Sequence, residues 1–164
     1  MLIRHLTGKK DARSLFYLAQ QYRDGSQWQK AIDTLGEYMK ISKFGDEKNL
    51  GKYYLRQSYF SLGDTDNAIK SLDSDIAEHH YYKGFIYYKD KQYDKAIAEM
   101  LRALQLGSSQ GSFSPIADIE SRAYDTLSMC FHHYGRNELA YSTAISSLGY
   151  RENKRVRNNL KYFK

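Results

Sequence analysis

The sequence has little of two residues that shape many small folds. Its 164 residues include one cysteine, Cys130, and one proline, Pro115. A single cysteine excludes an internal disulfide and a cysteine-based zinc cage, and it suits a reducing compartment. The near-absence of proline removes the commonest helix breaker, which favours a chain made mostly of helices. No apolar run approaches the ~20 residues of a membrane span, and the N-terminus is too short and polar for a secretory signal, so we expect a soluble, cytoplasmic protein with no membrane span.

Positive charge exceeds negative charge, because 25 Lys and Arg residues stand against 19 Asp and Glu, giving a formal net charge of +6. Such an excess favours an anionic partner, for example nucleic acid or lipid headgroups. Much of it lies in the tail, at Arg151, Lys154, Arg155, Arg157, Lys161 and Lys164. A basic final helix is most often a solvated face, so the charge alone does not select a nucleic-acid function.

Four short segments share one pattern, in which a turn is followed by a small residue that opens an amphipathic helix. They are Trp28–Ile32, Thr65–Ile69, Tyr93–Ile97 and Asn137–Tyr141, with the small residues Ala31, Ala68, Ala96 and Ala140. The spacing resembles that of tetratricopeptide repeats, in which two paired helices recur within ~34 residues. The pattern therefore predicts an all-α fold, a right-handed superhelical stack of about four helix-turn-helix repeats with a C-terminal capping helix.

Small residues are expected where the two helices of a pair approach closely. Ala19, Gly84 and Ser128 hold this position in the first, third and fourth repeats, whereas the second repeat has Arg56 there. Bulky Leu and Tyr residues at helical spacing form the stripe that neighbouring repeats bury.

The four alanines are unevenly spaced, at 37, 28 and 44 residues, which indicates a clipped helix in the second repeat near Ser71 to Ile76 and a loop before the fourth. The loop sequence is rich in Gly and Ser, as exposed connections are. We expect a junction segment at 1–11, a repeat region at 12–150 with repeats at about 12–45, 49–76, 77–107 and 121–150, a loop at 107–120, and a capping helix at 151–164.

A closer resemblance rests on three stretches of the chain. They are His5–Asp11 with Leu15–Asp24, then Gly111–Phe113 with Ser121–Tyr124, and finally Arg155–Phe163. These stretches are similar to the junction, first repeat, loop, fourth repeat and terminal helix of bacterial and phage family-2 glycosyltransferases that carry a C-terminal tetratricopeptide region. The resemblance implies that a nucleotide-sugar-binding α/β domain with a metal-binding Asp-x-Asp motif precedes such a region. That domain is absent here, so the chain is either a fragment cut at the junction or a repeat region encoded alone.

Two Asp-x-Asp triplets occur in the chain, and neither has the context of a metal site. Asp64-Thr65-Asp66 lies at a turn between paired helices, where Asp is a usual N-cap. Asp73-Ser74-Asp75 is expected on a helix, with its two carboxylates pointing in different directions. We expect both triplets to be structural, with no metal and no cofactor.

The other candidate chemical groups are two histidine pairs, His79-His80 and His132-His133, and Cys130. Two ligands on one helical turn are too few for zinc, which needs three or four. Cys130 is expected in the core, since no Asp or Asn completes a Cys-His nucleophile. We therefore expect no catalytic residue and no enzyme activity from this chain.

The first helix of each pair is expected to line a concave groove rich in aromatic residues. The predicted partner-binding residues are Phe16, Tyr17, Gln20, Arg23, Tyr53, Tyr54, Gln57, Tyr81, Tyr82, Phe85, Tyr88, Lys89 and Arg122. Arg13, Phe60, Asp125, Met129 and His132 are expected on the same face. Rings and Gln occupy the positions where many repeats of this type clamp a terminal carboxylate with paired Asn, so such a clamp is not expected.

We interpret the chain as a non-catalytic scaffold for protein-protein interaction, the C-terminal accessory region of a family-2 glycosyltransferase. Its partner would be a protein or peptide segment: the catalytic domain, its acceptor, a second subunit, or a second copy in a homodimer. The alternative is a basic helical-repeat module that binds nucleic acid through aromatic and basic residues.

Overall fold

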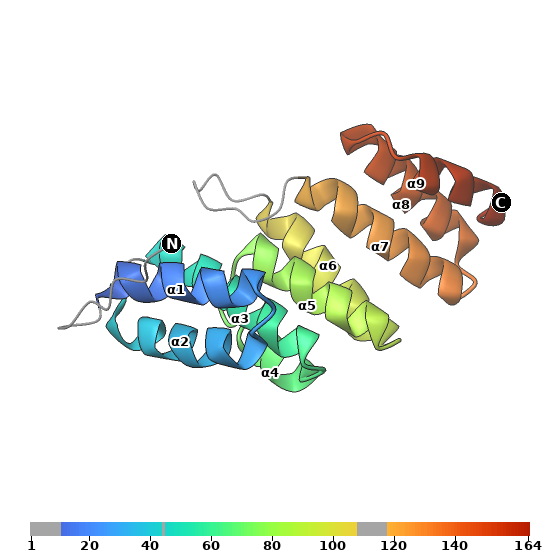
Figure 1. Cartoon of the computed structure of the whole chain (residues 1–164). Helices are drawn as coiled ribbons and strands as arrows, with labels where there is room; N and C mark the ends of the chain where they lie inside the picture. Colours follow the sequence, from blue (N-terminus) through green and yellow to red (C-terminus); the bar gives the residue numbers. More distant parts are fainter. Residues whose placement is uncertain (1–10, 44, 108–117) are drawn as a thin grey trace. The chain divides into compact units, whose positions relative to one another are not determined.

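The computed structural model describes residues 11–43, 45–107 and 118–164 (Figure 1). These residues form nine α-helices and one 3-10 helix, without a strand, which confirms the predicted all-α class. The predicted junction before Asp11 and most of the predicted loop, including Pro115, lie outside the described residues. The chain divides into two compact units, Met1–Ser71 and Leu72–Lys164.

The first unit contains two helical hairpins, shown in blue to green in Figure 1. Its helices are α1 (Ala12–Asp24), α2 (Trp28–Ile41), α3 (Gly45–Ser61) and α4 (Thr65–Lys70). Asp11 begins α1 as its N-cap, because its carboxylate accepts a 2.8 Å hydrogen bond from the Ser14 backbone N–H. One buried hydrophobic cluster of this unit contains Leu15, Phe16, Ala19, Leu35, Tyr38 and Tyr54.

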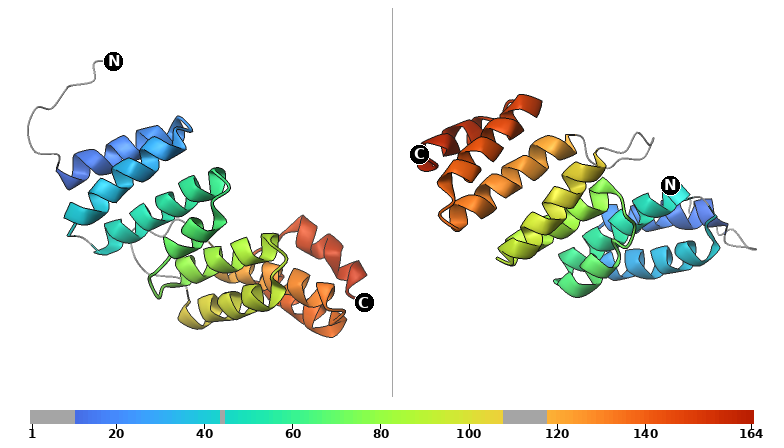
Figure 2. Two further views of the ribbon diagram at one scale, coloured as in Figure 1. Left: turned by 90° about the horizontal axis from the view of Figure 1, so that it is seen from below. Right: turned by 180° about the vertical axis from the view of Figure 1, so that it is seen from behind.

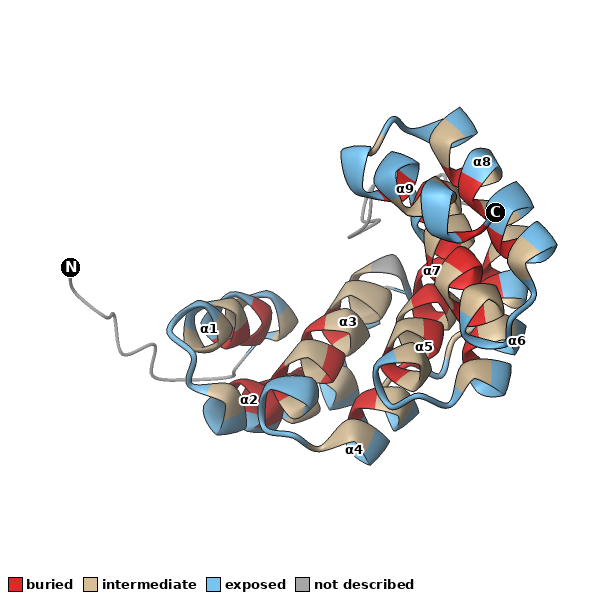
Figure 3. Cartoon of the chain, turned by 90° about the vertical axis from the view of Figure 1, so that its right-hand side faces the viewer, coloured by how far each residue is buried: buried red, intermediate tan, exposed pale blue. Residues whose placement is uncertain are grey.

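The second unit contains two further hairpins and a terminal cap, and Figure 2 shows the paired helices from two further sides. Its elements are α5 (Ala77–Lys89), α6 (Tyr93–Leu106), α7 (Ile119–His133), α8 (Asn137–Tyr150), α9 (Lys154–Asn159) and the 3-10 helix η1 (Leu160–Tyr162). Buried residues lie along both α5 and α7, shown in red in Figure 3. One cluster joins α5, α6 and α7, and a second one holds Val156 and Phe163 of the cap against Ala140 and Ala144 of α8.

All four hairpins turn in the same way. The backbone N–H that precedes the second helix donates to the carbonyl of an aromatic residue in the first helix, at 2.8 to 2.9 Å. The pairs are Gln27 with Tyr22, Asp64 with Tyr59, Gln92 with Tyr87, and Arg136 with Phe131. Each turn also contains one residue with positive φ: Ser26, Gly63, Lys91 and Gly135. The repeated turn places the four aromatic anchors at equivalent positions in their hairpins.

Close helix approach occurs where the sequence has small residues. A Cβ added to Gly84 would lie 3.2 Å from the Ala96 backbone oxygen and 3.0 Å from the Met100 terminal methyl. Ala19 and Ser128, at the equivalent position, are 1% exposed. Arg56 is also buried in the second hairpin, and its guanidinium lies 4.8 Å from the centre of the Tyr53 ring.

The connection between α4 and α5 follows a clipped second helix, as the alanine spacing indicates, but the expected position of one acidic triplet differs. Helix α4 ends at Lys70 and α5 begins at Ala77, so Asp73-Ser74-Asp75 lies in a non-helical connection, and its predicted placement on a helix was wrong. Because the second helix of this hairpin is short, these three residues lie beyond its end. The backbone N–H of Ser74 instead donates to Nδ1 of His79, at 3.2 Å.

The terminal cap begins after Arg151. The Asn153 side-chain oxygen accepts hydrogen bonds from the backbone N–H groups of Arg155 and Val156, which makes Asn153 the N-cap of α9. Val156 and Phe163 then bury against α8, while Lys154, Lys161 and Lys164 stay exposed. None of the described helices combines the length and apolarity needed to cross a membrane.

Candidate binding groove

The second unit has an open pocket of about 740 Å³ on the side formed by α5, α7 and the start of α9. Its lining residues are Tyr81, Phe85, Tyr88 and Lys89 from α5, Asp118, Ser121, Arg122, Asp125, Thr126 and Met129 from α7 and its N-cap, and Arg151, Glu152, Asn153 and Arg155 from the α8–α9 segment. We call this pocket the α5–α7 groove. The predicted residues from Tyr81 to Arg122 line it, except Tyr82, which packs against the neighbouring core.

The α5 side of the groove is aromatic. Tyr81 is buried, and its ring stacks on that of Phe85 with a centroid separation of 6.3 Å. Phe85 and Tyr88 are half-buried, which leaves part of each ring facing the groove. Burial raises the pKa of Tyr88, so its hydroxyl is neutral at physiological pH and can donate a hydrogen bond.

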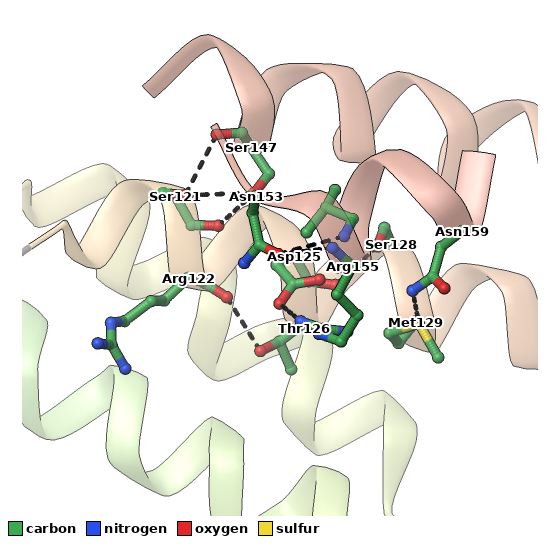
Figure 4. Close-up of polar contacts among 11 residues, drawn as sticks. Ser121, Arg122, Asp125, Thr126, Ser128, Met129, Ser147, Asn153, Arg155 and Asn159 are labelled. Atoms are coloured by element: carbon green, nitrogen blue, oxygen red, sulfur yellow. Dashed lines mark hydrogen bonds and ion pairs between the residues drawn. The ribbon is translucent and has the colours of Figure 1, made fainter. Parts of the chain in front are cut away.

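Ion pairs stabilise the walls of the groove on α7 and on the segment after α8. The Asp125 carboxylate of α7 pairs with the guanidinium of Arg155 of α9 (Figure 4). The Asp118 carboxylate pairs with Arg151 at 2.6 Å, and Glu152 pairs with Arg157 at 2.5 Å. Every carboxylate that lines the groove therefore already has an arginine partner.

A buried set of hydroxyl contacts fixes α8 behind these walls. The Ser121 and Ser147 hydroxyls donate to each other's backbone carbonyls, at 3.2 and 2.8 Å (Figure 4). Such buried contacts allow little sliding of α8 along α7. The α8–α9 segment therefore has a fixed starting point beside the groove.

Two cations of the groove have no acidic partner within the described residues. Lys89 lies at the end of α5 with its Nζ 5.4 Å from the centre of the Phe85 ring. Arg122 lies on α7, and its side chain extends away from the ion pair of Asp125 in Figure 4. The groove thus combines aromatic surface with two uncompensated positive charges.

The predicted residues of the first two repeats lie in the other unit, on α1 and α3. Phe16 stacks on Tyr54 at a centroid distance of 5.6 Å, and both rings are buried. The Gln20 side-chain amide donates to the Tyr54 hydroxyl at 3.1 Å, and the Arg23 guanidinium lies 3.9 Å from the centre of the same ring.

Burial separates the predicted rings into two groups. Phe16, Tyr54 and Tyr81 belong to core clusters, where their faces pack against neighbouring side chains, so we leave them out of the proposed contact surface. Tyr17 is 52% exposed, and Tyr53 and Gln57 are half-buried. Tyrosines at helical spacing do not by themselves distinguish core packing from a binding face, because both uses share the same period.

The third wall of the groove was not predicted from the sequence. Arg151 and Arg155 were placed only in the basic tail and Asn153 was not singled out, although all three line the pocket. A signal was present, because an Asn that follows a helix and precedes a polar helical stretch is a recognisable N-cap. The N-cap signal does not show that the α8–α9 segment turns back toward α7.

The Asp, His and Cys residues that were considered as metal ligands or nucleophiles make structural contacts. Asp64 is the N-cap of α4, and Asp75 pairs with Arg102 at 2.5 Å and with His80 at 2.9 Å. Cys130 is fully buried, and burial raises its pKa to about 12, which leaves it a protonated thiol and confirms its predicted place in the core. Among residues 11–43, 45–107 and 118–164, no three His, Cys, Asp or Glu side chains gather as metal ligands would.

Comparison with known proteins agrees with this architecture. Residues 13–41, which span α1 and α2, match the family model described as tetratricopeptide repeat. A search of curated protein sequences finds no match.

Solved structures give a broader match. A crystal structure of MamA is 21% identical, with a TM-score of 0.67, over 88% of this chain and 80% of that one. MamA RS-1, as the ArsTM double mutant, is 18% identical with a TM-score of 0.74, over 96% and 85%. PilF of Pseudomonas aeruginosa is 16% identical with a TM-score of 0.71, over 93% and 67%.

At these identities the likeness concerns the fold, and it gives no support to the nucleic-acid alternative. The repeated turn, the paired helices and the match over α1 and α2 together identify the fold as that of a tetratricopeptide repeat protein.

Proposed function

We propose that this chain is a non-catalytic scaffold that binds a segment of a partner protein in the α5–α7 groove. The observation that carries this proposal is the pocket itself, about 740 Å³ between three structural elements with half-buried rings on one side. Large rings that are held in place bury much area on binding at small entropic cost. A peptide segment meets such a surface through apolar side chains and backbone hydrogen bonds.

The catalytic alternative has no comparable support. An enzyme site needs a nucleophile, base or metal within reach of a bound molecule. The groove offers carboxylates that are already ion-paired, and the thiol of Cys130 is buried and protonated. Binding is therefore the function that these residues support best.

Site-specific photo-crosslinking in cells that naturally make the protein tests this proposal. A photoreactive phenylalanine analogue is placed at Tyr88, in the groove, and in parallel at Leu101, which is 52% exposed on α6 and does not line it. We expect a discrete crosslinked protein from Tyr88 and none from Leu101. Equal crosslinking from both positions, or crosslinking from Leu101 alone, would show that the groove is not the contact surface.

We also propose that the partner belongs to a glycosyltransferase system. The support is the resemblance of His5–Asp11, Leu15–Asp24 and Arg155–Phe163 to the C-terminal tetratricopeptide region of family-2 glycosyltransferases. The partner would then be a catalytic domain, its acceptor or a second subunit. The genomic sequence around the coding region tests this: we expect an α/β glycosyltransferase domain in frame or in an adjacent gene, and its absence from both contradicts the proposal.

A further inference from the structure

We infer that the α5–α7 groove takes an acidic partner segment, in which two carboxylate side chains flank an apolar stretch. This inference rests on the proposed function and specifies its ligand. It begins with the charges that line the groove: cationic Lys89, Arg122, Arg151 and Arg155 against anionic Asp118, Asp125 and Glu152.

The ion pairs among these residues leave an excess of positive charge in the groove. Arg151 and Arg155 are neutralised by Asp118 and Asp125, and Glu152 is neutralised by Arg157, which stands outside the groove. Lys89 and Arg122 remain as the uncompensated charges among the described lining residues. A cationic segment would meet only carboxylates that already have partners, whereas an acidic segment gains two new ion pairs without breaking one. Charge complementarity therefore favours an acidic ligand.

The positions of the two cations set a spacing for the ligand. Helices α5 and α7 pack side by side and run in the same direction (Figure 1). Gly84 and Ser128 are equivalent in their repeats; Lys89 follows Gly84 by five residues, and Arg122 precedes Ser128 by six. At a rise of roughly 1.5 Å per residue, the two cations are about 16 Å apart along the helix axes.

An extended peptide advances about 3.3 Å per residue, so it covers this distance in about five residues. Long Lys and Arg side chains widen the tolerance by about one residue in either direction. We therefore expect the two acidic side chains of the ligand to be separated by about four to six positions.

The rings lie at intermediate levels between the two cations. Phe85 and Tyr88 follow Gly84 by one and four residues, and Met129 lies on the α7 side. Lys89 is held beside the Phe85 ring, so the carboxylate that it binds lies next to apolar surface. The middle of the ligand should therefore carry Leu, Met or an aromatic residue.

A panel of synthetic peptides tests this inference. Each peptide has acetyl and amide caps, two Glu residues separated by two to eight positions, Leu residues between them, and Ser elsewhere. Fluorescence anisotropy with the full chain should give the tightest binding at a separation of four to six. Replacing both Glu by Gln should weaken that binding about 100-fold, at about tenfold for each lost charged contact.

Protein variants provide the matched test. Lys89→Gln and Arg122→Gln should each weaken binding of the best peptide about tenfold. Arg136→Gln is the control, because Arg136 is exposed outside the groove and its equivalents in two other hairpins are Gln27 and Gln92. It removes one charge from the same unit and should leave the affinity unchanged.

The outcomes separate this inference from the function beneath it. Peptides that bind equally well with Gln, or with Glu at any separation, would overturn the acidic ligand while leaving a binding groove. Absence of binding by the whole panel would also overturn it. If Tyr88 gives no specific crosslink in the cell experiment, the proposed function itself fails.

Discussion

The Asp125 carboxylate of α7 pairs through one oxygen with Arg155 of α9, while its other oxygen is buried and has no hydrogen-bond partner among the described residues. Burial is the strongest influence on this group and raises its pKa, although Arg155 acts in the opposite direction. Burial of the ionised carboxylate therefore destabilises the native state by more than the ion pair with Arg155 stabilises it. This contact between α7 and α9 lowers the stability of the fold.

We expect Asp125→Asn to reverse this cost in a pH-dependent way. A carboxyl group with a raised native pKa penalises folding most when pH is above that pKa, and the penalty disappears below the unfolded pKa of ~3.9. The melting temperature of the variant minus that of the wild type should therefore be greater at pH 7 than at pH 4. Thermal melts across this range measure the difference, and a difference that grows as pH falls contradicts the assignment.

Asp64 should show the opposite pH dependence. Hydrogen bonds from the Asn67 side chain and backbone lower the pKa of Asp64, which caps the six-residue helix α4. Stability from this cap is present above the unfolded pKa and is lost as pH falls through the native pKa. Asp64→Ala should lower the melting temperature at pH 7 and speed amide hydrogen exchange in α4. Asp64→Asn is the control, since Asn also caps helices well, and it should retain most of the protection.

The glycines of the second unit distinguish close packing from open surface. Gly84→Ala should destabilise by about 1 kcal/mol and Gly84→Val by up to ~3 kcal/mol, because a side chain meets the Ala96 carbonyl. Gly149, in α8, has no atom within 4 Å of an added Cβ. Gly149→Ala should therefore stabilise by about 0.5 to 1 kcal/mol. Denaturant titrations measure both, and equal effects at the two positions contradict the packing described here.

Cys130 reports on global unfolding. Its thiol is fully buried and its pKa is about 12, so the native protein presents no thiolate to an alkylating reagent. We expect iodoacetamide labelling to be very slow in buffer and to rise with denaturant in parallel with loss of helical circular dichroism. Rapid labelling of a protein whose helical signal is unchanged would show that α7 opens locally.

The sequence predicted the helical pairs because their turns and small residues are local features. Ala31, Ala68, Ala96 and Ala140 are all fully buried, as close packing of the second helices requires. The uneven alanine spacing indicated a clipped second helix in this hairpin, but it does not give the residue at which α4 ends, and the placement of Asp73–Asp75 on a helix was therefore wrong. In a helix of six residues, one turn more or less decides whether the residues that follow are helical.

The lining of the α5–α7 groove was only partly predictable from the sequence, for a different reason. Repeat offsets identified Phe85, Tyr88, Lys89 and Arg122, because the groove side of a first helix follows from its periodicity. The same offsets selected Phe16 and Tyr54, which stack on each other in the core. Pairing of arginines with carboxylates, which leaves Lys89 and Arg122 uncompensated, depends on tertiary contacts between α7 and the α8–α9 segment. No spacing within the sequence gives those contacts.

The central claim is tested most directly by titrating the crosslinked partner segment into two Tyr→Ala variants by isothermal calorimetry. Tyr88→Ala removes a groove ring, while Tyr162→Ala removes a ring that is 60% exposed on η1 and lies outside the groove. With melting temperatures checked for both, we expect Tyr88→Ala to lose ~1 to 2 kcal/mol of binding free energy and Tyr162→Ala to bind as the wild type does. Unchanged affinity for Tyr88→Ala, or a greater loss for Tyr162→Ala, would contradict binding through the α5–α7 groove.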